Sequence, residues 1–185
     1  MNESVRSFMI PKSEKEIMTL IGEKSPNDKL LLGAEYGILS MVKSALKDGA
    51  NINVTQKEYW TPLIIASMEG NTEIMEYLIE NGADMEHRTH FGSTAIVFAI
   101  DGNKLDAVKI LVEAGTNINV RANNDGTPFI SAAFKGYMEM VKYLLENGAD
   151  PTLIDWDKKS AVDWAEARKH YDVAEYIRSF MNTNE

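Results

Sequence analysis

Apolar residues recur along this chain in a pattern that repeats every 33 positions. Within residues 61–84, one short apolar stretch (LIIA, 63–66) is followed by a second (IMEYLI, 74–79), and residues 94–117 and 127–150 read in the same way. In the second stretch Ile74, Leu78 and Ile79 have the spacing of one helix face. The pattern therefore predicts a series of paired short helices.

Three further columns of residues keep the same period over four units. A glycine follows each second helix, a Thr or Ser precedes each first helix, and an alanine lies inside each first helix. They are Gly49, Gly82, Gly115 and Gly148; Thr61, Thr94, Thr127 and Ser160; and Ala66, Ala99, Ala132 and Ala165. A period of about 20–50 residues is typical of a solenoid or repeat array.

Two units begin with Thr-Pro, at 61 and 127, and both end in Gly-Ala-Asp, at 82–84 and 148–150. These motifs and the period resemble the ankyrin repeat. The resemblance implies an all-α ankyrin-repeat solenoid of about five helix-turn-helix repeats, with short N- and C-terminal capping helices. The histidine that this family usually carries after Thr-Pro-Leu is absent, so we expect apolar contacts there. Its positions hold Ile64, Val97, Ile130 and Asp163.

The repeats divide the chain into a short N-terminal segment and one repeat domain. We assign residues 1–22 to a tail and a capping helix, whose start Ser13 and Glu16 mark as a capping box. The repeat domain covers 23–181, and its last repeat lacks the Gly-Ala-Asp ending, as expected of a C-terminal cap. The repeats are 23–55, 56–88, 89–121, 122–154 and 155–181. Asn103 stands where other repeats have glycine at the end of the first helix, and Asn also tolerates the left-handed conformation.

Composition narrows the function classes. The chain has 185 residues and no cysteine, which excludes a disulfide framework, a thiolate zinc site and a catalytic cysteine. Its formal net charge of -9 argues against a general nucleic-acid binder. No apolar run has the length of a membrane span or of a signal peptide. We expect a cytoplasmic monomer without a cofactor.

Candidate chemistry is sparse. Ser40 and Lys43 match a short Ser-x-x-Lys pattern, but no companion motif accompanies it. His87 and His90 fall in a loop that varies between repeats, so we interpret them as solvated residues. We expect neither a catalytic nor a metal site.

Variable positions on the finger tips and inner helices usually contact the partner in the ankyrin family. Aromatic residues make up five of the 22 such positions, about 23%, whereas the chain as a whole is 9% aromatic. Aromatic residues and arginine are enriched in binding hot spots. The predicted partner-binding residues are Tyr36, Trp60, Met68, Glu69, Phe91, Asp101, Phe134, Lys135, Trp156 and Arg168.

Three functions remain open. The first is a non-catalytic module that binds another protein on its concave face. The second is a small-substrate enzyme that uses groove carboxylates such as Glu69 and Asp101. The third is an inert fragment of a larger assembly. The aromatic residues of the first hypothesis have an alternative role, because Trp60 and Phe91 lie one repeat apart and could stack on each other.

The opposite face is expected to be structural. One column that recurs at the period is predicted to pack between outer helices, and it consists of Tyr77, Ile110, Tyr143 and Tyr176. Acidic residues of the outer helices are predicted to form a solvated convex surface. Those at the helix starts are Glu73, Asp106, Glu139 and Asp172.

Overall fold

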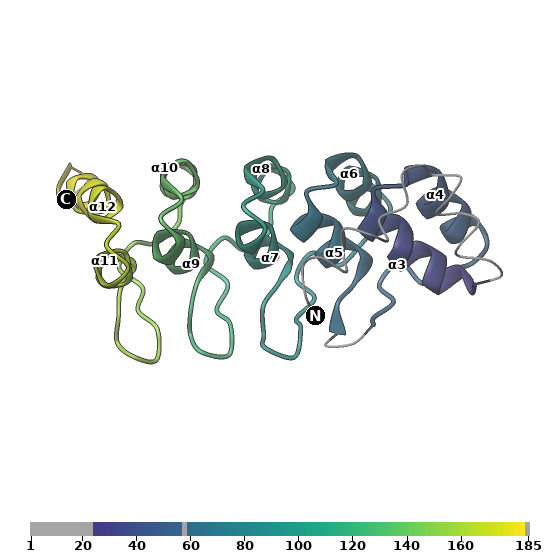
Figure 1. Cartoon of the computed structure of the whole chain (residues 1–185), viewed down its shortest axis with the longest axis horizontal. Coiled ribbons are helices and arrows are strands. Elements are labelled where there is room, and N and C mark those ends of the chain that lie inside the picture. Colours follow the sequence, from purple (N-terminus) through teal and green to yellow (C-terminus); the bar gives the residue numbers. More distant parts are fainter. Residues whose placement is uncertain (1–23, 57–58, 184–185) are drawn as a thin grey trace, which may run out of the picture.

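The computed structural model describes residues 24–56 and 59–183. This part of the chain contains ten helices, arranged as five antiparallel pairs (Figure 1). The capping helix predicted near Ser13 and Glu16 lies outside the described residues. The helices are α3 (Pro26–Tyr36), α4 (Leu39–Lys47), α5 (Pro62–Glu69), α6 (Thr72–Glu80), α7 (Ala95–Asp101), α8 (Leu105–Glu113), α9 (Pro128–Lys135), α10 (Met138–Glu146), α11 (Ala161–Ala167) and α12 (Tyr171–Thr183).

The pairs stack side by side in one direction. Figure 1 shows α3, α5, α7, α9 and α11 in an inner row and the other five helices in an outer row. Between consecutive pairs, long loops project beyond the inner row, and we call these loops fingers. The fingers are residues 51–56 with 59–60, then 84–93, 117–126 and 150–159. The all-α solenoid predicted from the sequence is confirmed.

The inner helices α5 and α9 start and end as their sequences predict. The hydroxyl Oγ1 of Thr61 accepts a hydrogen bond from the backbone N–H of Ile64, and Thr127 accepts one from Ile130 in the same way. A proline occupies the first turn of each helix, where a missing N–H costs nothing. Both helices end at a left-handed glycine, whose φ is 77° at Gly70.

Helix α7 begins and ends differently. Thr94 precedes it but makes no side-chain capping bond, and Ala95 stands where the other two helices have proline. At the opposite end Asn103 takes the left-handed conformation with φ 56°, as expected for the residue that replaces glycine there. Helix α7 therefore keeps its place in the stack with fewer local stabilising features than its neighbours.

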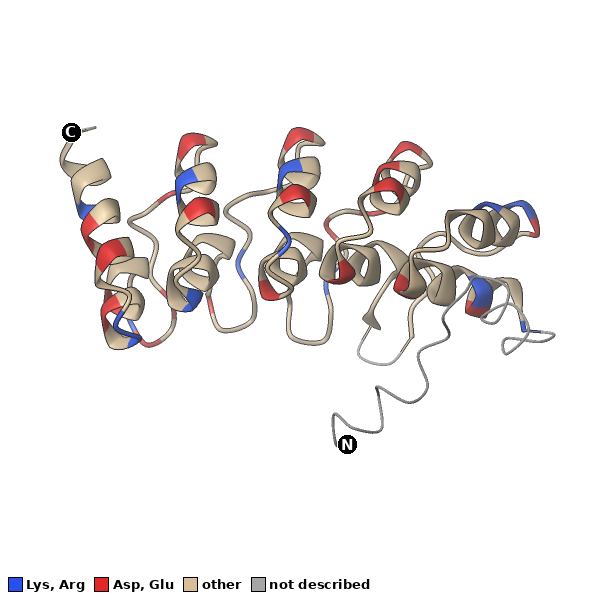
Figure 2. Cartoon of the chain, turned by 45° about the horizontal axis from the view of Figure 1, so that its top comes forward, with Lys and Arg blue, Asp and Glu red and all other residues tan. Residues whose placement is uncertain are grey.

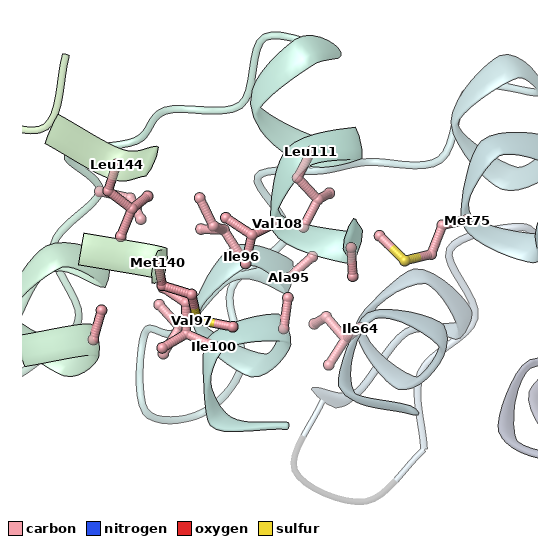
Figure 3. Packing of buried hydrophobic residues seen from close by; sticks show 14 of the residues in the cluster. Ile64, Met75, Ala95, Ile96, Val97, Ile100, Val108, Leu111, Met140 and Leu144 are labelled. Atoms are coloured by element: carbon pink, nitrogen blue, oxygen red, sulfur yellow. The ribbon is translucent and has the colours of Figure 1, made fainter. Parts of the chain in front are cut away.

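One continuous apolar core lies between the two rows of helices (Figure 3). Ile64 and Ile96 from inner helices and Met75 and Leu111 from outer helices are almost completely buried. Removing each such side chain from water is worth about 1.5–3 kcal/mol. The apolar contact expected in place of the family histidine is confirmed at Ile64. Because each pair buries its apolar side chains against the adjacent pair, the pairs are stable only as a stack.

The last inner helix, α11, starts with a capping box. Ser160 accepts a hydrogen bond from the N–H of Asp163, whose carboxylate in turn accepts bonds from the N–H and the hydroxyl of Ser160. These bonds hold the pKa of Asp163 below its usual value. Asp163 thus caps a helix at the position where the preceding repeats bury an apolar side chain.

Candidate functional site: the concave groove

The fingers are joined to one another by hydrogen bonds. The guanidinium of Arg88 donates from Nη1 to the backbone carbonyl of Arg121 at 2.7 Å, and Arg121 donates in the same way to the carbonyl of Ile154 at 3.1 Å. Backbone N–H groups add bonds from Asn123 to Phe91 and from Trp156 to Asn124. The fingers therefore form a connected wall beside the inner helices.

A hollow of about 430 Å³ opens between this wall and helices α7, α9 and α11. Ser93 and Ser131 both line it, and they are small where the equivalent positions one repeat earlier hold Trp60 and Phe98. The other lining residues are Val97, Asp101, Ala122, Asn124, Gly126, Ile130, Phe134, Lys135, Asp155 and Trp164.

Two aromatic rings form one side of the hollow. Phe134 of α9 and Trp164 of α11 meet edge to face with their centroids 5.3 Å apart. The indole Nε1 of Trp164 donates to the Asp155 carboxylate at 2.6 Å, which fixes the ring against the finger. Lys159 lies 4.1 Å above Trp164, and Arg168 lies 4.5 Å above Phe134. Cations are attracted to ring faces at these distances.

Charged residues close the hollow on the side of α7. Lys135 Nζ lies 3.2 Å from the Asp101 carboxylate, and the two side chains come from adjacent inner helices. Both are partly exposed, so the pair contributes about 0–1 kcal/mol to stability. Glu69 at the end of α5 is exposed. It does not line the hollow.

The repeat geometry agrees with a comparison to known families. A model described as "Ankyrin repeats (3 copies)" matches residues 30–122, and one described as "Ankyrin repeats (many copies)" matches 111–165.

The chain belongs to the ankyrin-repeat family.

Individual relatives match only part of the chain. It is 35% identical over 78 residues to palmitoyltransferase AKR1 of Lachancea kluyveri, covering 41% of this chain and 11% of that protein. Alpha-latrotoxin-Lh1a of Latrodectus hasselti is 34% identical over 86 residues, 46% of this chain and 6% of the toxin. Ankyrin repeat, SAM and basic leucine zipper domain-containing protein 1 of Mus musculus is 25% identical over 75 residues, covering 40% and 16%. The chain thus spans a small fraction of these relatives, and the likeness concerns ankyrin repeats.

Three of the predicted contact residues of this ankyrin-repeat chain are exposed aromatics. Tyr36 at the end of α3 is 44% exposed, Phe91 is 60% exposed and Trp156 is 70% exposed. Phe91 meets the ring of His90 edge to face at 5.5 Å. Phe91 and Trp156 both lie on fingers, so the finger wall carries large apolar surface into solvent.

Trp60 does not stack on Phe91. Its ring meets Phe98 of α7 edge to face at a centroid distance of 4.9 Å, and the residue is half-buried. Its indole Nε1 is buried without a hydrogen-bond partner among the described residues. Trp60 therefore fills a space between two repeats of the ankyrin stack, because a finger end and the middle of the next inner helix face each other there.

The remaining predicted residues divide between the inner-helix ends and the hollow. Met68 and Phe134 are half-buried, and Glu69 and Arg168 are exposed. The structure brings Asp101 to Lys135 and Phe134 to Arg168.

Sequence reasoning missed Ser131, Asp155 and Trp164, although all three line the hollow. Trp164 carried a signal, since it is a large aromatic residue in the last inner helix. The signal of Ser131 is its small size at a position where Phe98 and Trp164 stand one repeat away on either side.

The convex face of the ankyrin stack agrees with its prediction. Tyr77 and Tyr176 are partly buried against the core, with Lys43 and Lys142 above their rings. Burial raises the pKa of the Tyr143 hydroxyl. Figure 2 shows acidic residues along the outer helices.

Residues 24–56 and 59–183 contain neither a candidate metal site nor a candidate membrane span. No group of three or more His, Asp or Glu side chains there could hold a metal ion. No helix in the same part of the chain is both long and apolar enough to cross a membrane.

Proposed function

We propose that this ankyrin-repeat chain is a non-catalytic module that binds a partner protein on the concave face formed by its fingers and inner helices. The observation that carries the proposal is the hollow between α7, α9 and α11, bordered by a finger wall that exposes Phe91 and Trp156. Exposed apolar surface of this kind is typical of interaction sites. Partner side chains would enter the hollow, and the exposed rings would cover them.

The preformed geometry supports binding at this face. Hydrogen bonds from Arg88 and Arg121 fix the fingers before any partner arrives. Trp164 is held by Asp155 in the same way. A rigid face loses less conformational entropy on association than a mobile one.

The carboxylates of the hollow favour this function over the enzyme alternative. Asp101 pairs with Lys135, and Asp155 accepts the indole N–H of Trp164. Glu69, the other candidate of the enzyme hypothesis, is exposed on the end of α5 and lies outside the hollow. Both carboxylates of the hollow thus already have a partner, which leaves neither placed as a free general acid or base.

The test is capture of proteins from a lysate of the source cell by the wild-type chain and by the double variant Phe91→Ala/Trp156→Ala, identified by mass spectrometry. Both side chains are mostly in solvent, so the variant keeps its fold, which circular dichroism verifies. The matched control is Tyr171→Ala at the start of outer helix α12, because Tyr171 is 63% exposed.

We expect a protein that the wild type and Tyr171→Ala retain and that the double variant loses. Losing a hot-spot aromatic costs about 2 kcal/mol or more of binding free energy, about 30-fold in affinity. Equal retention by the double variant would refute the concave face. Equal loss in Tyr171→Ala would move the site to the outer helices.

A further inference from the structure

The ends of the inner helices change the sign of their charge along the stack. Successive helices present Glu69 at the end of α5, Asp101 at the end of α7 and Lys135 at the end of α9, and Arg168 directly follows α11. The outer helices follow a different order, since α4 carries two lysines and no acidic residue, whereas α6, α8, α10 and α12 each carry acidic residues. The row of inner-helix ends is therefore acidic at α5 and α7 and basic at α9 and after α11.

The middle of this row is neutral. Asp101 and Lys135 neutralise each other across adjacent helices at 3.2 Å. Their pairing leaves Glu69 on one side and Arg168 on the other as the outer charges of this row of four helix ends. Arg168 lies over the Phe134 ring, and the hollow opens beside that ring. The groove thus has three zones, which are acidic, neutral with a hollow, and basic with aromatic rings.

We propose that the occupant of the groove is an extended peptide segment with basic residues in one half, acidic residues in the other and an apolar side chain between them. This inference rests on the proposed function and specifies the chemistry of the partner. Its basic half lies beside Glu69, its acidic half beside Arg168, and the apolar side chain enters the hollow lined by Ser93 and Ser131.

The dimensions of the stack set the length of the segment. Neighbouring packed helices lie about 8–10 Å apart, so the three steps from α5 to α11 span about 24–30 Å. An extended chain advances about 3.3 Å per residue. A segment of about eight or nine residues therefore reaches from Glu69 to Arg168.

Salt screens the charge interactions between the two ends of the groove, so each end interacts with a ligand independently of the other. The Debye length is about 8 Å at physiological ionic strength, much shorter than the span of the groove. The ends are therefore recognised locally, and the net charge of -9 does not decide which segment binds. A uniformly basic segment would place like charge against Arg168, and a uniformly acidic one would place it against Glu69. Such repulsion is a source of specificity.

The test measures fluorescence anisotropy of three labelled ten-residue peptides with the whole chain. The segregated peptide carries three basic residues, then Ser-Phe-Ser-Leu, then three acidic residues. A second peptide has the same composition with alternating charges, and a third is basic throughout. The variants are Arg168→Glu and its counterpart Glu69→Lys. Lys47→Glu, on the exposed end of outer helix α4, makes the same charge change as Arg168→Glu away from the groove.

The wild type and Lys47→Glu should bind the segregated peptide about tenfold more tightly than the alternating one at low salt, and the difference should shrink as salt is added. Arg168→Glu and Glu69→Lys should each lose about tenfold for the segregated peptide. Arg168→Glu should in turn gain affinity for the basic peptide.

Three results would overturn the inference. The first is no binding of the segregated peptide at about 1 mM, a concentration that corresponds to a binding free energy of only about -4 kcal/mol. The second is equal binding of the alternating peptide. The third is that the Arg168 and Glu69 substitutions leave binding of the segregated peptide unchanged. If these fail while Phe91→Ala/Trp156→Ala still loses its captured protein, the groove binds a partner of other chemistry and only this inference falls. If that double variant loses nothing, the proposed function itself falls.

Discussion

Two successive junctions between repeats are built from the same backbone elements, but large side chains fill one and small side chains leave the other open. At the junction of α5 and α7, Trp60 from the finger end packs on Phe98 of the next inner helix. One repeat later the equivalent positions hold Ser93 and Ser131, and both line the hollow. The comparison shows that side-chain volume at two positions decides whether a junction is filled or open.

The helix ends follow the same contrast. At the filled junction Gly102 lies so close to the backbone carbonyl of Met68 that a Cβ atom would collide with it. At the open junction, one repeat on, Lys135 stands in the place of Gly102 and forms its ion pair with Asp101. The filled junction is closed by backbone approach, whereas the open one is spanned by long side chains.

Emptying the filled junction should have the largest effect. Trp60→Ala should lower the free energy of unfolding by about 2–3 kcal/mol, because it leaves a cavity beside Phe98. Trp60→Phe is the matched control. It keeps an aromatic ring and removes an indole N–H that has no acceptor among the described residues, so it should cost less than about 1 kcal/mol. Urea denaturation measures both, and equal costs would show that the ring contact is not what stabilises this junction.

Widening the filled junction comes next. Gly102→Ala should cost about 2 kcal/mol, because the new methyl group must displace the Met68 carbonyl. The backbone of Gly102 is right-handed, so conformational strain does not contribute. Lys135→Ala at the equivalent position should cost about 0–1 kcal/mol, because the lost ion pair is partly exposed. A reversed order of the two costs in urea denaturation would contradict the assignment of the two junctions.

Filling the open junction should change binding rather than stability. Ser131→Phe copies the residue found at position 98 and should weaken the segregated peptide about tenfold, which is about 1.4 kcal/mol. Its free energy of unfolding should stay within about 1 kcal/mol of wild type, since the hollow has room for the ring. Ser131→Ala leaves the hollow open and is the control. Undiminished binding by Ser131→Phe would place the peptide elsewhere.

The smallest expected effect is the difference in stability between two substitutions at the starts of α7 and α9, the helices on either side of the hollow. Thr127→Ala removes a hydrogen bond to the N–H of Ile130 and should cost about 1 kcal/mol. Thr94→Ala removes a buried hydroxyl without a partner among the described residues, so it should be nearly neutral. Thermal unfolding of the two variants side by side makes the comparison, and equal losses would mean that Thr94 caps α7 in solution.

The fold could be predicted from the sequence because its determinants are local and recur. Pro62 and Thr61 mark a helix start within a few residues. Asn103 could be assigned to a left-handed turn because the repeats on either side have glycine at that position. The period then implied the stacking of the pairs.

The hollow could not be predicted, because it depends on residues from different columns of the repeat. Trp60 lies on a finger and Phe98 inside the next helix, and only the packed structure shows that these columns face each other. The sequence therefore marked Trp60 as a contact residue, although its ring fills a junction. It passed over Ser131, since a small residue is conspicuous only when its three-dimensional neighbours are known.

The bonds between fingers bear on how such an array can grow. Arg88 and Arg121 each donate to a backbone carbonyl of the following repeat, and every residue type offers that acceptor. A tandem duplication of residues 89–121 would therefore join at both ends without a compensating substitution at the acceptor. It would also copy Ser93 and lengthen the row of fingers. Because these inter-finger hydrogen bonds use main-chain acceptors, a repeat can be added without a change in the sequence of the repeats that flank it.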